Sequence, residues 1–186
     1  MPGAGLGAWG GSLAWGRGLG NSRGLRGGGA PGNVAGVSKK SAKVAALIAA
    51  CAGRDLDAHY LAYFECFNRG LYYEAHDVLE PLWLQGRAGP NHGFYKGLIQ
   101  LTAAFVHLQK NRLRPSAALF NLAEENLKKY PATHERLDVQ ATLELIRRWR
   151  GQLEAADFQV NPLNPGSAPK LVLESARPAS AENPNP

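Results

Sequence analysis

The 186-residue chain has room for one domain with extended ends, and its net charge of +6 comes from 21 Lys and Arg against 15 Asp and Glu. Residues 55–157 hold 12 basic and 13 acidic side chains, so the excess positive charge lies outside them, which argues against a specific nucleic-acid partner. The two cysteines, 15 residues apart, exclude a disulfide scaffold, and the lack of an 18-residue apolar run excludes a membrane span.

Residues 1–52 are predicted to be a disordered, Gly-rich, basic leader. Residues 1–36 hold 14 of the 22 glycines, and no Asp or Glu occurs before Asp55. A segment of this composition has no periodic apolar face to bury. We expect a cytoplasmic protein; the alternative is an organelle protein, because an Arg-bearing leader without acids is also typical of a transit peptide.

Between residues 55 and 157 the apolar side chains recur with helical spacing, and no run alternates as a strand would. Caps and stops divide this part into five predicted helices. They are a segment capped by Asp55 or Asp57 and stopped at Gly70, Leu71–Gln85, residues 92–110 after Asn91 as N-cap, a segment between NRLRP and Pro131, and a segment capped by Asp138.

The predicted fold class is all-α. Short connections make neighbouring helices antiparallel, so we expect a compact bundle of about five antiparallel helices over residues 53–158. Residues 159–186 are Pro-rich and without sustained period, and they are predicted to be a disordered tail.

The second predicted helix carries a candidate site. Its residues Tyr73, His76, Glu80 and Trp83 are spaced by three, four and three positions, which places them along one stripe. Because four residues rise about 6 Å, His76 and Glu80 can reach one metal ion from adjacent turns. Pro81 removes a backbone donor and bends the helix beside Glu80.

The third predicted helix carries a second stripe. It consists of Gly93, Gly97, Gln100, Ala104 and His107. The small residues predict a close helix crossing. Folding the two helices into a hairpin sets Gln100 opposite the pair of His76 and Glu80. His107 is then expected about one turn further along, level with Glu74.

Two interpretations of these residues remain open. In the first, His76, Glu80 and His107 bind one divalent ion, either Zn²⁺, Mn²⁺ or Fe²⁺. Three side chains would support these ligands: Tyr73, Trp83 and Gln100. The catalytic candidates are then Glu80 and Glu74, with Glu74 as the reserve general base. In the second, His76, Glu80 and Gln100 form a buried hydrogen-bond network that fixes helix register.

The stretches FNRGLYYEAHDVLEPLW and FYKGLIQLTAAFVHLQKN resemble the bacterial, archaeal and plastid family called domain of unknown function family 309, over about residues 57–130. The family's His-x-x-x-Glu-x-x-Trp motif is met at His76, Glu80 and Trp83. Its GLIQ segment and the following His are met at residues 97–100 and at His107. Members are often labelled predicted metal-dependent hydrolases, so the resemblance implies an all-α fold and convergence of these side chains.

Two functions follow from this pattern. The first is a metal-dependent hydrolase acting on a small-molecule substrate. The alternative is a non-catalytic, tetratricopeptide-like helical-hairpin module with a binding or structural role. Helix pairs ending in LKKYP favour the alternative, although no 34-residue repeat is visible.

Overall fold

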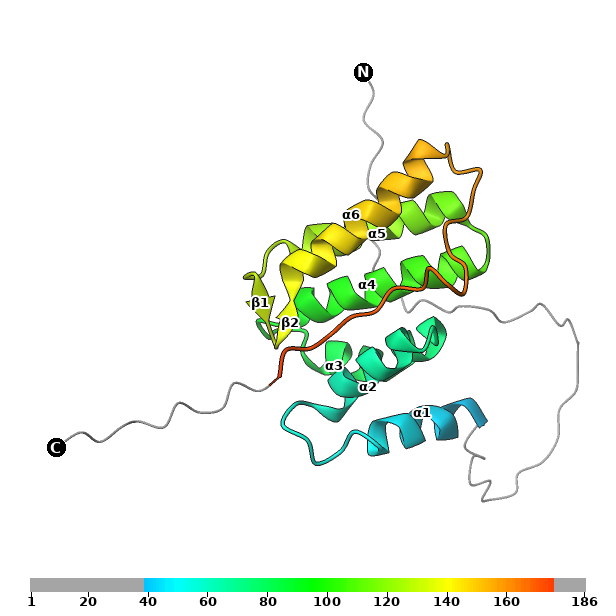
Figure 1. The fold of residues 1–186 in the computed structure, drawn as a ribbon. Helices are drawn as coiled ribbons and strands as arrows, with labels where there is room; N and C mark the ends of the chain where they lie inside the picture. Colours follow the sequence, from blue (N-terminus) through cyan, green and yellow to red (C-terminus); the bar gives the residue numbers. More distant parts are fainter. Residues whose placement is uncertain (1–38, 176–186) are drawn as a thin grey trace, which may run out of the picture. The chain divides into compact units, whose positions relative to one another are not determined.

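The computed structural model describes residues 39–175 of the chain. The chain divides into two units, Met1–Gly36 and Val37–Pro186, and all described residues belong to the second. Within the described residues, six helices and one small antiparallel sheet follow one another (Figure 1). They are α1 (Lys39–Ala49), α2 (Ala58–Asn68), α3 (Tyr72–Gln85), α4 (His92–Gln109), α5 (Leu113–Leu127), β1 (Thr133–His134), β2 (Leu137–Asp138) and α6 (Val139–Ala155). The predicted all-α fold class is confirmed for this part of the chain.

Capping residues set the ends of the helices where the sequence predicted them. The Asp57 carboxylate accepts hydrogen bonds from two backbone N–H groups of the first turn of α2, at 2.8 and 3.3 Å. Gly70 follows the end of α2 with a φ of 71°, a conformation that glycine adopts without strain. Asp138 caps α6 by accepting from the N–H of Ala141 at 2.8 Å. Helix α6 buries apolar residues that recur at helical spacing: Val139, Leu143, Ile146, Trp149 and Leu153.

Phe105 of α4 lies at the centre of the core. Its ring centroid is 5.5 Å from that of Phe67 on α2 and 4.9 Å from that of Tyr72 on α3. The rings of Phe120 on α5 and Trp149 on α6 lie 5.3 and 5.0 Å from it. A single side chain of α4 therefore joins the α2/α3 pair to the α5/α6 pair.

The helices α4 and α5 cross closely where α4 has glycines. A Cβ atom added at Gly97 would lie 2.7 Å from Cγ of Leu127, and one at Gly93 would lie 2.9 Å from the hydroxyl oxygen of Tyr130. Side chains larger than hydrogen do not fit at these separations. The close crossing predicted from the small residues of α4 is therefore present, and its partner is α5.

Helix α1 lies within the segment that we expected to be a leader. Its apolar residues Val44, Leu47 and Ile48 recur at helical spacing and pack against the core. The ammonium of Lys43 lies 2.7 Å from the carboxylate of Glu74, which links α1 to α3. These three apolar residues span little more than one helical turn, which is too short a pattern to predict a helix from the sequence. Residues 1–38 of the expected leader lie outside the described residues.

Residues 159–175, here named the returning segment, form no helix but pack on the helices (orange to red in Figure 1). Leu171 in this segment is only 4% exposed. Asn68 of α2 donates to the carbonyl of Leu171 and accepts from its N–H, both at 2.7 Å. Leu173 forms a β-bridge with Leu137. Part of the expected tail is thus attached to the domain, and residues 176–186 lie outside the described residues.

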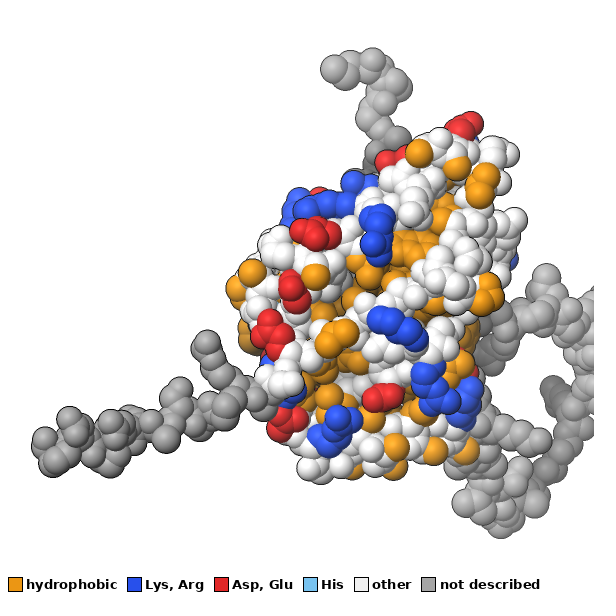
Figure 2. Space-filling view, viewed as in Figure 1, with side chains coloured by type: hydrophobic (Ala, Val, Ile, Leu, Met, Phe, Trp, Pro, Cys, Tyr) orange, Lys and Arg blue, Asp and Glu red, His pale blue; other side chains and the backbone are white. Residues whose placement is uncertain are grey.

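The described part of the chain contains no helix that is long and apolar enough to cross a bilayer. On the face drawn in Figure 2, Lys and Arg side chains are interspersed with Asp and Glu. This mixture agrees with the near balance of charges counted for residues 55–157.

Candidate functional site

The motif residues lie on α3, at the edge of its buried face. The residues that α3 buries are Tyr72, Ala75, Val78 and Leu79. The predicted stripe starts one position later, which is a rotation of about 100° around the helix. Its members Tyr73, His76, Glu80 and Trp83 are accordingly half-buried rather than buried.

His76 and Glu80 remain one turn apart on a continuous helix, because α3 runs through Pro81 without a break. The His76 side chain is 19% exposed, and its Nδ1 lies 3.5 Å from Oδ1 of Asp77. Within residues 39–175, the Glu80 carboxylate forms no hydrogen bond and no ion pair. Glu80 is thus a half-buried acceptor without a partner in the described chain.

Trp83, the last residue of the motif, connects the end of α3 to the start of α4. Its ring stacks on that of His92, with centroids 5.5 Å apart and an interplanar angle of 23°. The Trp83 indole N–H donates to Nε2 of His92 at 3.3 Å. This bond assigns the ring proton of a neutral His92 to Nδ1. No pattern in the sequence indicates this role of His92, although His92 lies directly across the turn from Trp83.

Gln100 does not face the pair of His76 and Glu80 on α3, so its predicted placement opposite this pair is wrong. His107 was predicted level with Glu74, and the end of α4 that carries it does contact the start of α3, where Gln109 donates to the carbonyl of Gly70 at 3.0 Å. Gln100 accepts a hydrogen bond from the side chain of Asn126 on α5 at 2.8 Å. His107 lies two turns further along the same side of α4 as Gln100. The hairpin packs differently than expected because α4 turns Phe105 toward α3, and Phe105 lies on the other side of the helix from Gln100.

His107 is buried, with 6% of its surface exposed. Burial lowers the pKa of its imidazole, and the nearby charges of Arg112 and Lys110 lower it further. The ring is therefore kept neutral at physiological pH. A neutral imidazole is a competent metal ligand, but in this structure it lies away from His76 and Glu80.

Glu74 of α3 forms an ion pair with Lys43 of α1. Burial raises the pKa of its carboxyl, but the hydrogen bond from Lys43, together with a backbone N–H bond and the Lys43 charge, outweighs burial, so the pKa lies below its usual value. A carboxylate held in its charged form by a lysine is a weak proton acceptor. This contact argues against Glu74 as a general base while α1 is in place.

Among residues 39–175 there is no group of three or more His, Cys, Asp or Glu side chains placed to hold a metal ion. The three ligands named from the sequence, His76, Glu80 and His107, are therefore not gathered at one point. What the structure keeps together is the pair of His76 and Glu80, with Asp77 beside the imidazole.

Long-range polar contacts at the start of α4 were not predicted. Asn91, expected as a helix cap, makes no capping bond; instead it donates to Glu135 at 2.6 Å and accepts from Nε2 of His134 at 2.8 Å. The N–H of Phe94 is capped by the hydroxyl of Tyr130 at 2.8 Å. These partners lie 36 to 44 positions apart in the sequence, so no local pattern could have indicated them.

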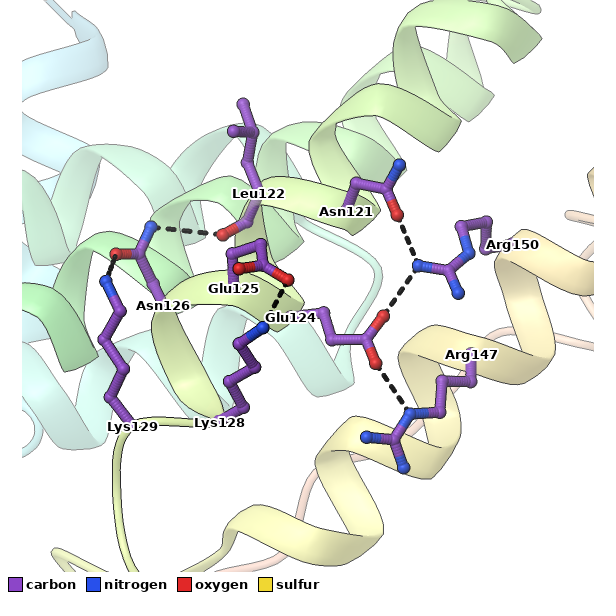
Figure 3. A network of polar contacts seen from close by, with 9 residues as sticks. All are labelled: Asn121, Leu122, Glu124, Glu125, Asn126, Lys128, Lys129, Arg147 and Arg150. Atoms are coloured by element: carbon purple, nitrogen blue, oxygen red, sulfur yellow. Dashed lines mark hydrogen bonds and ion pairs between the residues drawn. The ribbon is translucent and has the colours of Figure 1, made fainter.

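A charged cluster between α5 and α6 has a structural explanation (Figure 3). The carboxylate of Glu124 accepts from Arg147 at 2.7 Å and from Arg150 at 2.6 Å. Arg150 also donates to the side-chain carbonyl of Asn121. The charged side chains of this cluster pair with one another across α5 and α6, so the cluster does not indicate a ligand site.

Comparison with known proteins identifies one segment. Residues 60–119 match the model of a family described as Domain of unknown function (DUF309). The search of curated proteins found no match, and neither did the search of solved structures. The match contains α3 and α4 whole, and thus His76, Glu80 and Trp83, and it confirms the family resemblance seen in the sequence.

Proposed function

We propose that the face of α3 that carries Tyr73, His76, Glu80 and Trp83, here named the motif face, binds one divalent ion, Zn²⁺, Mn²⁺ or Fe²⁺, through His76 and Glu80. This face lies within residues 60–119, which match the DUF309 family. The observation that carries the proposal is the state of Glu80, a half-buried carboxylate with no hydrogen bond or ion pair among the described residues. Its oxygens are reached by water and engaged by no described protein group, so they are available as ligands to a metal ion.

The donor set suits such an ion. An imidazole and a carboxylate are ligands that these three metals accept. The carboxylate of Asp77, 3.5 Å from Nδ1 of His76, can hold the ring in the orientation that leaves Nε2 for the metal. Tyr73 and Trp83 flank the pair and limit its access to water.

The reaction class that we propose is hydrolysis of a small-molecule substrate. A bound divalent ion supplies Lewis-acid chemistry, which polarises the oxygen of an ester, amide or phosphate group. With two protein ligands, most of the coordination sphere stays open to the substrate. Glu80 then acts as a ligand, and Glu74 serves as a base only in a state in which Lys43 has released it.

A second candidate is a non-catalytic helical-hairpin module with a binding or structural role. The stack of Trp83 on His92 favours it, because it gives the third motif residue a packing role that needs no metal. In this case the only role of the motif face would be to fix the turn between α3 and α4. The network with Gln100 that we predicted for this alternative is not part of it, since Gln100 is bonded to Asn126.

Metal analysis of protein purified without an affinity tag separates the two candidates. The metal proposal predicts uptake close to one ion per chain and loss of this uptake in Glu80→Gln. The matched control is Glu144→Gln, at an exposed glutamate of α6, which should bind like the wild type. If wild type and Glu80→Gln take up equally little metal on titration, the structural module is the better account.

Hydrolysis itself is tested by assaying ester, amide and phosphoester substrates with the metal-loaded protein. The proposal predicts turnover that EDTA abolishes and that Glu80→Gln lacks. Metal uptake without any turnover would leave a metal-binding module and remove the hydrolase assignment.

A further inference from the structure

A pocket of about 550 Å³ lies away from the motif face, where the α2–α3 turn, the end of α4 and the returning segment meet. Twelve residues line it, and none of them is Asp or Glu, whereas Arg69 and Lys170 are cationic. Neither His76 nor Glu80 contributes to the lining. The pocket is thus a separate feature with a positive charge.

The two cations are placed differently. The Arg69 side chain is exposed and forms no hydrogen bond or ion pair within residues 39–175, so its fork of N–H donors is available. The Lys170 ammonium is held at the pocket by a hydrogen bond to the carbonyl of Asn68. A guanidinium and an ammonium that line one pocket can together recognise a phosphate or carboxylate group.

The start of α3 contributes a ring to the pocket rather than a donor. Tyr72 lines the pocket, but its hydroxyl is closed off from water and does not reach a molecule bound there. The first turn of α3 already holds a carboxylate of its own, Glu74, which accepts from a backbone N–H.

The remaining wall is partly apolar. Leu163 and Pro165 from the returning segment supply it, with the buried Leu108 of α4 behind them. A purely inorganic ion would leave this apolar surface without a partner. The volume lies in the range of sites that hold small organic molecules.

We infer that this pocket binds a small organic anion, whose carboxylate or phosphate group contacts Arg69 and Lys170 while its apolar part lies on Leu163 and Pro165. The returning segment supplies one side of the pocket, and it lies outside residues 60–119, which match the DUF309 family. The site is therefore built jointly by the family domain and by a segment that the match does not include. It does not depend on the proposed metal function.

The test is calorimetric titration of the full chain with butanoate and with butyl phosphate, and with inorganic phosphate for comparison, at constant ionic strength. We expect saturable binding of at least one organic anion, tighter than that of inorganic phosphate. If only one of the two organic anions binds, its acidic group, carboxylate or phosphate, is the one that the pocket recognises. Arg69→Met and Lys170→Met should each weaken binding by about tenfold or more.

Both substitutions are at exposed positions, so the variants should fold, and far-UV circular dichroism checks this. The matched control is Arg148→Met, at an exposed arginine of α6 that does not line the pocket, and it should bind like the wild type. Binding that is equal in all four proteins, or the absence of binding to either organic anion, would overturn the inference. Metal uptake should be unchanged in Arg69→Met, so failure here is distinct from failure of the metal proposal.

Discussion

At the scale of single residues, Glu124 shows how a charge contributes to stability in this protein. Its side chain is 15% exposed and accepts hydrogen bonds from Arg147 and Arg150 across the α5–α6 interface. Burial raises the pKa of the carboxyl, but the two arginine hydrogen bonds and the arginine charges outweigh burial, so the pKa is lowered. The folded state therefore holds this proton less tightly than the unfolded chain.

Glu124→Gln should reduce the free energy of unfolding by about 1 to 2 kcal/mol at neutral pH, because charge-assisted bonds are replaced by neutral ones. Since the folded pKa is the lower one, this stabilisation is present above the unfolded pKa and is lost as the pH falls through the folded pKa. Urea unfolding of both proteins across the acid range measures the difference.

A control for this prediction is Glu125→Gln. Glu125 is 62% exposed and pairs only with Lys128 in its own helix, so its loss should change stability by less than about 0.5 kcal/mol. A difference between wild type and Glu124→Gln that does not shrink in acid would show that the ion pairs are not its cause.

Tyr130 is a second residue whose hydroxyl has a defined role. It accepts from the N–H of Phe94 at 2.8 Å and donates to the carbonyl of Pro90 at 2.8 Å, thereby capping α4 from outside the helix. Tyr130→Phe should cost about 1 to 2 kcal/mol in unfolding free energy, because both groups lose their partner. Tyr95→Phe is the control: its hydroxyl has one long contact, 3.4 Å from Asn91, and an equal loss there would contradict this role.

At the scale of elements, the contact between α4 and α5 rests on the absence of a side chain at Gly97. A Cβ there would lie 2.7 Å from Cγ of Leu127, whose side chain is fully buried and has no room to move aside. Gly97→Ala should therefore destabilise the fold by about 1 to 3 kcal/mol through forced separation of the helices. Thermal unfolding measured by circular dichroism detects a change of this size.

The same substitution at Gly151 of α6 is a matched comparison. No atom lies within 4 Å of a Cβ added there, beyond the helix's own backbone, so Gly151→Ala should stabilise the protein by about 0.5 to 1 kcal/mol. If both substitutions changed stability in the same direction, close packing at the α4–α5 crossing would not be the reason for Gly97.

The helices could be predicted from the sequence because their determinants are local. Asp57 and Asp138 cap the helices that they were expected to cap, and the apolar period located five of the six described helices. The partner of each helix face could not be predicted in this way. Gln100 lies on a stripe of small residues that could pack against either α3 or α5. Because Phe105, on the other side of α4, packs against α3, the Gln100 stripe faces α5.

The candidate site could be predicted in part for the same reason. The i, i+4 spacing of His76 and Glu80 is a property of one helix, and it is retained in the structure. Convergence with His107 depends on how two helices rotate against each other, which spacing within either helix does not fix. The role of Lys43 beside Glu74 was missed because α1 was not predicted.

At the scale of the whole domain, the returning segment completes the core. Leu171 is 4% exposed although no helix contains it, whereas its neighbour Val172 is 75% exposed. Leu171→Ala should lower the free energy of unfolding by about 2 to 3 kcal/mol, because it leaves a cavity beside α2. Val172→Ala should change it by less than about 0.5 kcal/mol. Equal effects in urea unfolding would mean that the segment does not pack in solution as it does here.

We propose that the motif face of α3 holds a metal ion through His76 and Glu80, and paired thermal melts test this most directly. Wild type, Glu80→Gln and the control Glu144→Gln are each melted with EDTA and with excess Zn²⁺ or Mn²⁺. We predict that metal raises the midpoint of wild type and control by several degrees and leaves Glu80→Gln unchanged. With EDTA, Glu80→Gln should be at least as stable as wild type, because Glu80 has no partner among the described residues to lose. Melts that no metal shifts in any of the three proteins would contradict the claim.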